Sequence, residues 1–111
     1  MPEISEEAKN LVTQFQVYQQ QLQSVLIQKE NFKLQSLEIE RALEELEKTK
    51  QKTAYKITGQ IMINKPVSEL KKELNENKEA VGVRLKGLEK TEEKINNKLK
   101  DLQEKLKEVM K

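Results

Sequence analysis

Apolar residues recur at alternating steps of three and four positions along the first half of the chain. The series comprises Ile4, Ala8, Leu11, Phe15, Tyr18, Leu22, Val25, Lys29, Phe32, Ser36, Ile39, Leu43 and Leu46. Only two of its members, Lys29 and Ser36, are polar. This heptad repeat is typical of a long helix that packs along a partner helix. Ser5 is placed to cap such a helix, which we predict from about Ser5 to about Lys50.

A second heptad series occupies the C-terminal part of the chain. It comprises Val67, Leu70, Leu74, Asn77, Val81, Leu85, Leu88, Glu92, Ile95, Leu99, Leu102, Leu106 and Val109. Two successive steps of four, from Asn77 to Val81 and from Val81 to Leu85, shift the repeat and are expected to unwind a supercoil locally. The series predicts a second helix from about Ser68 to about Met110.

The segment between the two series alternates apolar and polar residues around Gly59. This alternation predicts a strand, a turn and a second strand over about residues 53–65. A three-residue loop centred on Gly59 would pair Ile57 with Ile61 and Tyr55 with Ile63, leaving one apolar face, and we favour it. A two-residue loop would split the isoleucines between the faces, and a loop without strands is the remaining alternative. Because a lone hairpin is marginally stable, an apolar hairpin here would need strands from other chains.

The short connection favours antiparallel packing of the two helices within one chain. If residue numbers in facing layers add to about 117, Leu11 meets Leu106 and Leu43 meets Leu74. The two polar residues Lys29 and Glu92 then fall in adjacent layers. They can pair across the helix interface and set its register, or both can extend outward into water.

Charge is distributed unevenly over the predicted helix pair. From residue 10 to residue 28 the first helix has no charged residue, and seven of these nineteen residues are glutamine. Val12, Leu26 and Met110 fall outside the heptad series near the open end of the pair. An isolated coiled coil normally has charged flanks, so this neutral flank indicates contact with another molecule. The alternative is a solvated face built from glutamine, which forms helices well.

Composition excludes several classes of function. The chain has no Cys and no His, which excludes disulfides, Cys nucleophiles and His bases, and we expect no enzyme and no cofactor. Its 21 basic and 19 acidic residues are interleaved, which disfavours a nucleic-acid interface. The longest aliphatic run, residues 25–27, is far too short to cross a membrane. Charged residues make up 36% of the chain, which is typical of long helices. We therefore expect a cytoplasmic protein that binds other proteins.

The order of these elements, and several stretches within them, resemble the prefoldin beta subunits of archaea. These stretches are YQQQLQ at 18–23, RALEELE at 41–47, AYKITG at 54–59, and ELKKEL followed by RLKGLEKTEEKINNKLKDLQEKL in the second helix. The similarity covers nearly the whole chain and includes a single hairpin, where the alpha subunit has two. It implies a mainly α fold, a long antiparallel two-helix coiled coil joined by one β-hairpin that joins an intersubunit β-barrel, in one domain over 1–111.

The resemblance also implies a function, partners and sites. Prefoldin is an ATP-independent chaperone of two alpha and four beta subunits that captures unfolded proteins at its coiled-coil tips and passes them to a group II chaperonin. The residues expected to bind such clients are Ile4, Leu11, Val12, Leu106, Val109 and Met110. Those expected to join the subunits are Tyr55, Ile57, Gly59, Ile61 and Ile63. The competing reading is a coiled-coil spacer or tethering subunit of another assembly, which would need no apolar hairpin.

Overall fold

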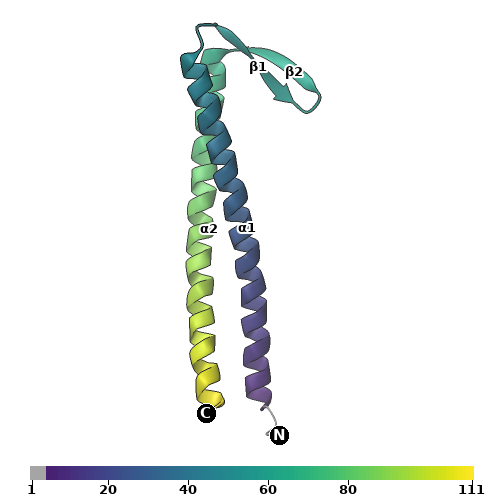
Figure 1. Cartoon of the computed structure of the whole chain (residues 1–111), viewed down its shortest axis with the longest axis vertical. Helices are drawn as coiled ribbons and strands as arrows, with labels where there is room; N and C mark the ends of the chain where they lie inside the picture. Colours follow the sequence, from purple (N-terminus) through teal and green to yellow (C-terminus); the bar gives the residue numbers. More distant parts are fainter. Residues whose placement is uncertain (1–4) are drawn as a thin grey trace. The chain divides into compact units, whose positions relative to one another are not determined.

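The computed structural model describes residues 5–111 as two long helices joined by a β-hairpin (Figure 1). The elements are α1 (Glu6–Lys48), β1 (Thr53–Thr58), β2 (Ile61–Pro66) and α2 (Val67–Val109). The predicted elements are all present, with ends within two residues of those expected. Ser5 caps α1 as predicted, because its Oγ accepts a hydrogen bond from the Ala8 backbone N–H at 3.1 Å. Ile4 lies outside the described residues.

The chain divides into two compact units. The terminal unit contains residues 1–30 and 86–111, and the hairpin unit contains residues 31–85. Each unit therefore includes part of α1 and part of α2, and only the hairpin unit includes the strands. The sequence-based prediction of one domain over 1–111 stays a prediction.

In the terminal unit the two helices run antiparallel and bury the predicted apolar series (Figure 1). The most buried side chains are Ala8, Leu11 and Val25 of α1 and Ile95 and Leu102 of α2. The residues that complete the series, such as Phe15 and Leu99, are half-buried, and the positions between them are exposed. The alternating step of three and four thus placed one stripe of each helix against the other.

In the hairpin unit the helix segments pack in the predicted register. Glu40 pairs with Lys78 at 3.7 Å and Glu47 with Lys71 at 3.1 Å, so the two ion pairs bracket the predicted layer of Leu43 with Leu74. The Arg84 guanidinium lies 5.6 Å from the centre of the Phe32 ring. The buried residues here are Val67, Leu70 and Val81. Asn77, which the heptad series placed in the interface, is exposed.

The hairpin is present, but the favoured register was wrong. Ile57 pairs with Met62 and Thr58 with Ile61, so the loop consists of Gly59 and Gln60. Gly59 has a φ of 61°, and no non-glycine residue among 5–111 has a positive φ, which matches a type II′ turn with glycine at its first central position.

The error has a physical cause. The three-residue loop was favoured because a buried apolar face normally specifies register. Neither face of this hairpin is packed against a core of its own chain, so the turn geometry decides instead. A type II′ turn matches the right-handed twist of the strands that it joins, and glycine makes the required positive φ accessible.

Candidate functional site

The observed register gives the hairpin two different faces, both with exposed apolar residues. Residues directly opposite each other share a face, so Tyr55, Ile57 and Met62 lie together on one face, with Asn64. We call this the outer face. Ile61 and Ile63 lie on the other, the inner face, with Lys56 and Lys65.

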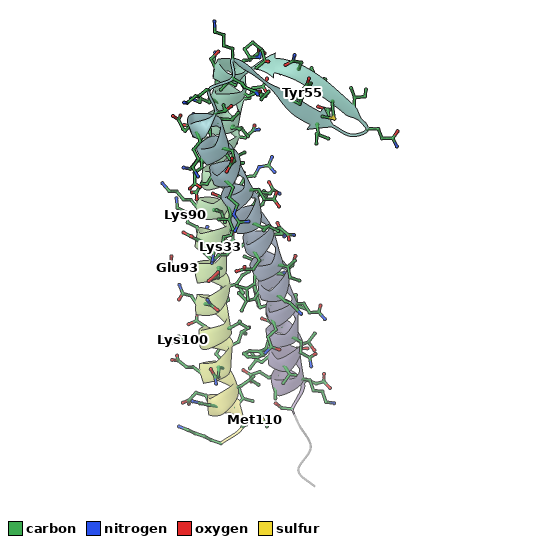
Figure 2. The ribbon with its side chains drawn as sticks, turned by 45° about the horizontal axis from the view of Figure 1, so that its top comes forward. Lys33, Tyr55, Lys90, Glu93, Lys100 and Met110 are labelled. Atoms are coloured by element: carbon green, nitrogen blue, oxygen red, sulfur yellow. The ribbon has the colours of Figure 1, made fainter. Side chains whose placement is uncertain are left out.

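Exposure differs between the two faces at one position. Ile63 on the inner face is 40% exposed against 71% for Ile57 on the outer face, whereas Ile61 of the inner face and Met62 of the outer face are 63% and 62% exposed. Figure 2 shows Tyr55 on the strand, where its side chain is open to solvent. Met62, which the predicted register left among the polar positions, joins the outer face. The sequence could have indicated this position, because Met62 is apolar and lies opposite Ile57 when the loop has two residues.

A cluster of charges joins the inner face to α2. The Glu73 carboxylate accepts a hydrogen bond from Lys56 of β1 at 3.0 Å and from Lys65 of β2 at 2.7 Å. Hydrogen bonding to Lys65 and then to Lys56 lowers the pKa of Glu73 below its ordinary value. The same bond to Glu73 raises the pKa of Lys65. No local pattern in the sequence indicates this cluster, since its members come from three separate elements.

A cavity of about 320 Å³ lies beside this cluster, within the hairpin unit. Its lining is mostly apolar and consists of Ala42, Glu45, Leu46, Ala54, Tyr55, Lys56, Leu70, Glu73, Leu74 and Asn77. The cavity therefore extends the apolar surface of the hairpin toward the ends of the two helices.

The predicted client-binding residues of the terminal unit differ in exposure. Leu11 is only 8% exposed, because it packs between the helices, and Leu106 and Val109 are half-buried. Val12 is exposed, and Met110 is 63% exposed at the end of the chain, where Figure 2 shows it. The accessible part of this predicted site is therefore smaller than the apolar series suggested.

The neutral flank of α1, which the sequence predicts to contact another molecule, has two further exposed apolar residues besides those predicted, Val17 and Ile27. Val17 and Ile27 are exposed together with Leu26, and all three lie in the stretch without charge. By contrast, α2 in the same unit presents exposed charged side chains such as Lys90, Glu93 and Lys100 (Figure 2). The sequence could have indicated these exposed residues, because they are apolar, lie outside the heptad series and belong to a segment without charged residues.

Lys29 and Glu92 form the ion pair that the facing layers allowed. Lys29 Nζ lies 2.6 Å from a Glu92 carboxylate oxygen, and the lysine side chain is only 14% exposed. The hydrogen bond to Glu92 raises the pKa of Lys29. Of the two alternatives, pairing across the interface is therefore confirmed.

The described helices and strands show neither a metal-binding cluster nor a membrane span. Over this range no group of acidic, His or Cys residues is arranged to hold a metal ion. Neither described helix is apolar enough over sufficient length to span a membrane.

Comparison with known proteins decides the family. Residues 9–111 match the family described as prefoldin subunit. The chain belongs to the prefoldin subunit family. The prefoldin subunit beta of Archaeoglobus fulgidus is 37% identical over 111 residues, covering 99% of this chain and 96% of that protein. The prefoldin subunit beta of Thermococcus onnurineus is 38% identical over 107 residues, covering 96% and 92%.

A solved structure of the family has the same fold. The crystal structure of the prefoldin beta subunit from Thermococcus strain KS-1 superposes with a TM-score of 0.88 and 34% sequence identity. The match covers 98% of this chain and 96% of that one. The family resemblance and the mainly helical fold with one hairpin are therefore confirmed.

Proposed function

We propose that this chain is a beta-type subunit of a hexameric chaperone that captures non-native proteins at the ends of its helix pair, without ATP. Its partners are an alpha-type prefoldin subunit, in an assembly of two alpha and four beta chains, and a group II chaperonin that receives the client. The chain acts in the cytoplasm as one domain over 1–111, without a cofactor and without binding nucleic acid or membrane. Membership of the prefoldin subunit family supports this proposal.

The observation that carries the assembly step is the hairpin with two uncovered apolar faces. Ile57, Ile61 and Met62 are all mainly exposed in the single chain. Burying one such side chain contributes about 1.5–3 kcal/mol, and a two-stranded sheet has unpaired edges that accept further strands. Strands from other subunits would cover the apolar faces and pair with the open strand edges, in a shared β-barrel.

Client capture is supported by the open end of the terminal unit. Val12 and Met110 are exposed there, and the neutral flank of α1 continues the surface without charge. A non-native protein exposes apolar segments that such a surface can cover. Each contact is weak, but several arms that hold one client raise the effective concentration of the later contacts, which removes the need for a deep pocket.

The test compares two matched surface changes in the particle assembled with an alpha-type subunit. Val12→Ser with Met110→Gln removes exposed apolar groups at the open end, and Val83→Thr removes one in the hairpin unit, where Val83 is also exposed. We expect the first variant to lose most of its suppression of aggregation of a denatured test protein, and the second to retain it. Both should keep the particle mass in native mass spectrometry.

Two outcomes would contradict the proposal. If the intact particle does not suppress aggregation, the spacer or tether reading gains support. If the variant at the open end suppresses aggregation as well as the intact particle does, client capture takes place on another surface.

A further inference from the structure

Glu73 links both strands of the hairpin to α2 through its two carboxylate oxygens. One oxygen accepts from Lys56 on β1 at 3.0 Å and the other from Lys65 on β2 at 2.7 Å. Glu69, one helical turn earlier, lies 3.7 Å from Lys65. A single side chain of the helix therefore contacts the two strands at separate points, which restrains rotation of the hairpin more than one contact would.

Both lysines belong to the inner face. In the observed register Lys56 is opposite Ile63, and Lys65 is opposite Ala54. Their pairing with Glu73 holds the inner face toward α2 where the strands meet the helix, while Ile57 of the outer face is 71% exposed. Ile63, opposite Lys56, is 40% exposed, whereas Ile61 beside the turn is 63% exposed, so Glu73 acts on the part of the hairpin away from the turn.

The backbone holds the hairpin at its base. Residues 49–52 connect α1 to β1 without helix or strand, whereas β2 passes directly into α2. One backbone hydrogen bond, from the Val67 N–H to the Lys52 carbonyl at 2.9 Å, closes the base. A lone two-stranded hairpin is only marginally stable in water, so its orientation depends largely on side-chain contacts to the helix.

We propose that Glu73 is a positioning residue for subunit assembly: it fixes the angle at which the hairpin leaves α2, so that the outer face, with Tyr55, Ile57 and Met62, is presented to a neighbouring subunit. This rests on the proposed function, in which the hairpin is the assembly element. A pre-oriented surface loses less conformational entropy on association, so it binds more tightly than a swinging one.

The proposal also indicates the chemistry of the neighbouring surface. The outer face consists of Thr53, Tyr55, Ile57, Met62, Asn64 and Pro66, none of which is charged. The hairpin's two lysines face Glu73 and Glu69 instead. The surface that covers the outer face is therefore an apolar strand face, with no acidic groups required to balance the lysines.

The hairpin orientation can be measured directly, because the chain has no cysteine of its own. Gln60→Cys in the turn and Asn75→Cys on the exposed side of α2 provide two spin-label positions within the hairpin unit. Pulsed electron paramagnetic resonance should give a narrow distance distribution in this background. We expect Glu73→Gln to broaden it and to raise the dissociation constant of the complex with an alpha-type subunit about tenfold or more.

Two further sets of variants separate positioning from general loss of charge or fold. Glu47→Gln also removes an ion pair of the hairpin unit, with Lys71 at 3.1 Å, but Glu47 pairs with no strand residue, so it should change neither measurement. Lys56→Met with Lys65→Met should match Glu73→Gln, and adding Glu73→Gln to it should have little further effect. Circular dichroism should show unchanged helix content in all of them.

A narrow distance distribution between the two spin labels in the Glu73→Gln variant would overturn the proposal. So would a broadened distribution with an unchanged dissociation constant, because orientation would then not limit assembly. The proposed function fails separately, if Ile57→Asp leaves the complex intact. Assembly that is lost in Ile57→Asp and unaffected in Glu73→Gln would keep the hairpin as the assembly element and remove Glu73 from the mechanism.

Discussion

The hairpin and the open end of the helix pair are both apolar, yet they differ in how the apolar groups are covered. On the hairpin, Ile57 and Ile61 are mainly exposed on opposite faces. At the open end, Leu11 is buried between the helices, and of the predicted client contacts within residues 5–111, Val12 is 40% and Met110 63% exposed. A surface that is uncovered on both faces is suited to permanent burial in an assembly, whereas a few accessible side chains are suited to weak, reversible contact.

The largest expected effect comes from placing a charge on the hairpin. Ile57→Asp should abolish assembly with an alpha-type subunit, because burying a carboxylate without a partner costs far more than the isoleucine contributed. Light scattering should show loss of the full particle mass, while circular dichroism shows that the helices remain. Ile63→Asp should act in the same way from the inner face. Retention of the full mass would mean that the hairpin is not the assembly element.

Removal of the open end should affect capture without affecting assembly. Trimming residues 1–12 together with 106–111 removes all the predicted client contacts and leaves the hairpin unit unchanged. We expect the assembled mass, less the trimmed residues, to be retained and the suppression of aggregation to be lost. Undiminished suppression by the trimmed particle would place the client on the barrel or along the coil flanks.

Acid should loosen the hairpin. The pKa of Glu73 is lowered below its ordinary value of 4.5, so its pairing contributes fully above about pH 4.5 and is lost as the pH falls through the lowered value. The pKa of Lys65 is raised above 10.5, so its contribution is lost only as the pH rises through that higher value. The distance distribution between labels at positions 60 and 75 should broaden in strong acid. In Glu73→Gln, the broad distribution should not change over the same range.

Replacing the ion pair of the terminal unit should raise stability. Lys29→Leu with Glu92→Leu fills a mainly buried layer with apolar side chains, which often equals or exceeds a buried ion pair in stability. We expect Tm to rise by about 5 °C in calorimetry, with each single variant below the wild type. A fall in the Tm of the double variant would show that the pair stabilises the fold more than packing can.

The smallest expected effect comes from the glycines of α2. A Cβ built at Gly82 or Gly87 meets no atom within 4 Å, and both residues are helical. Each glycine in a helix interior costs about 1 kcal/mol relative to alanine. Gly82→Ala and Gly87→Ala should therefore each raise the free energy of unfolding by about that amount in urea titrations. A decrease in either variant would indicate that α2 needs its flexibility there.

Much of the helix pair was predictable from the sequence, because the heptad pattern that specifies it is local and repeats along both helices. The heptad series identified the buried stripes of both helices, and Ser5 identified the start of α1. The facing layers also brought Lys29 and Glu92 together, since register over many layers leaves few alternatives. The exposed position of Asn77 shows the limit of this inference, next to the shift in the repeat.

The sequence determined that a hairpin forms, but not the register in which its strands pair. Its register depended on the turn, because no face of it is buried in the single chain. The alternation of residues fits two registers, which differ in the face that each β2 side chain shares with β1. The contact of Glu73 with both strands depends on the angle at which the hairpin leaves α2, which no local pattern records. Helix periodicity is thus readable from the chain alone, whereas the orientation of the surface that meets other subunits was decided by tertiary contacts between residues of separate elements.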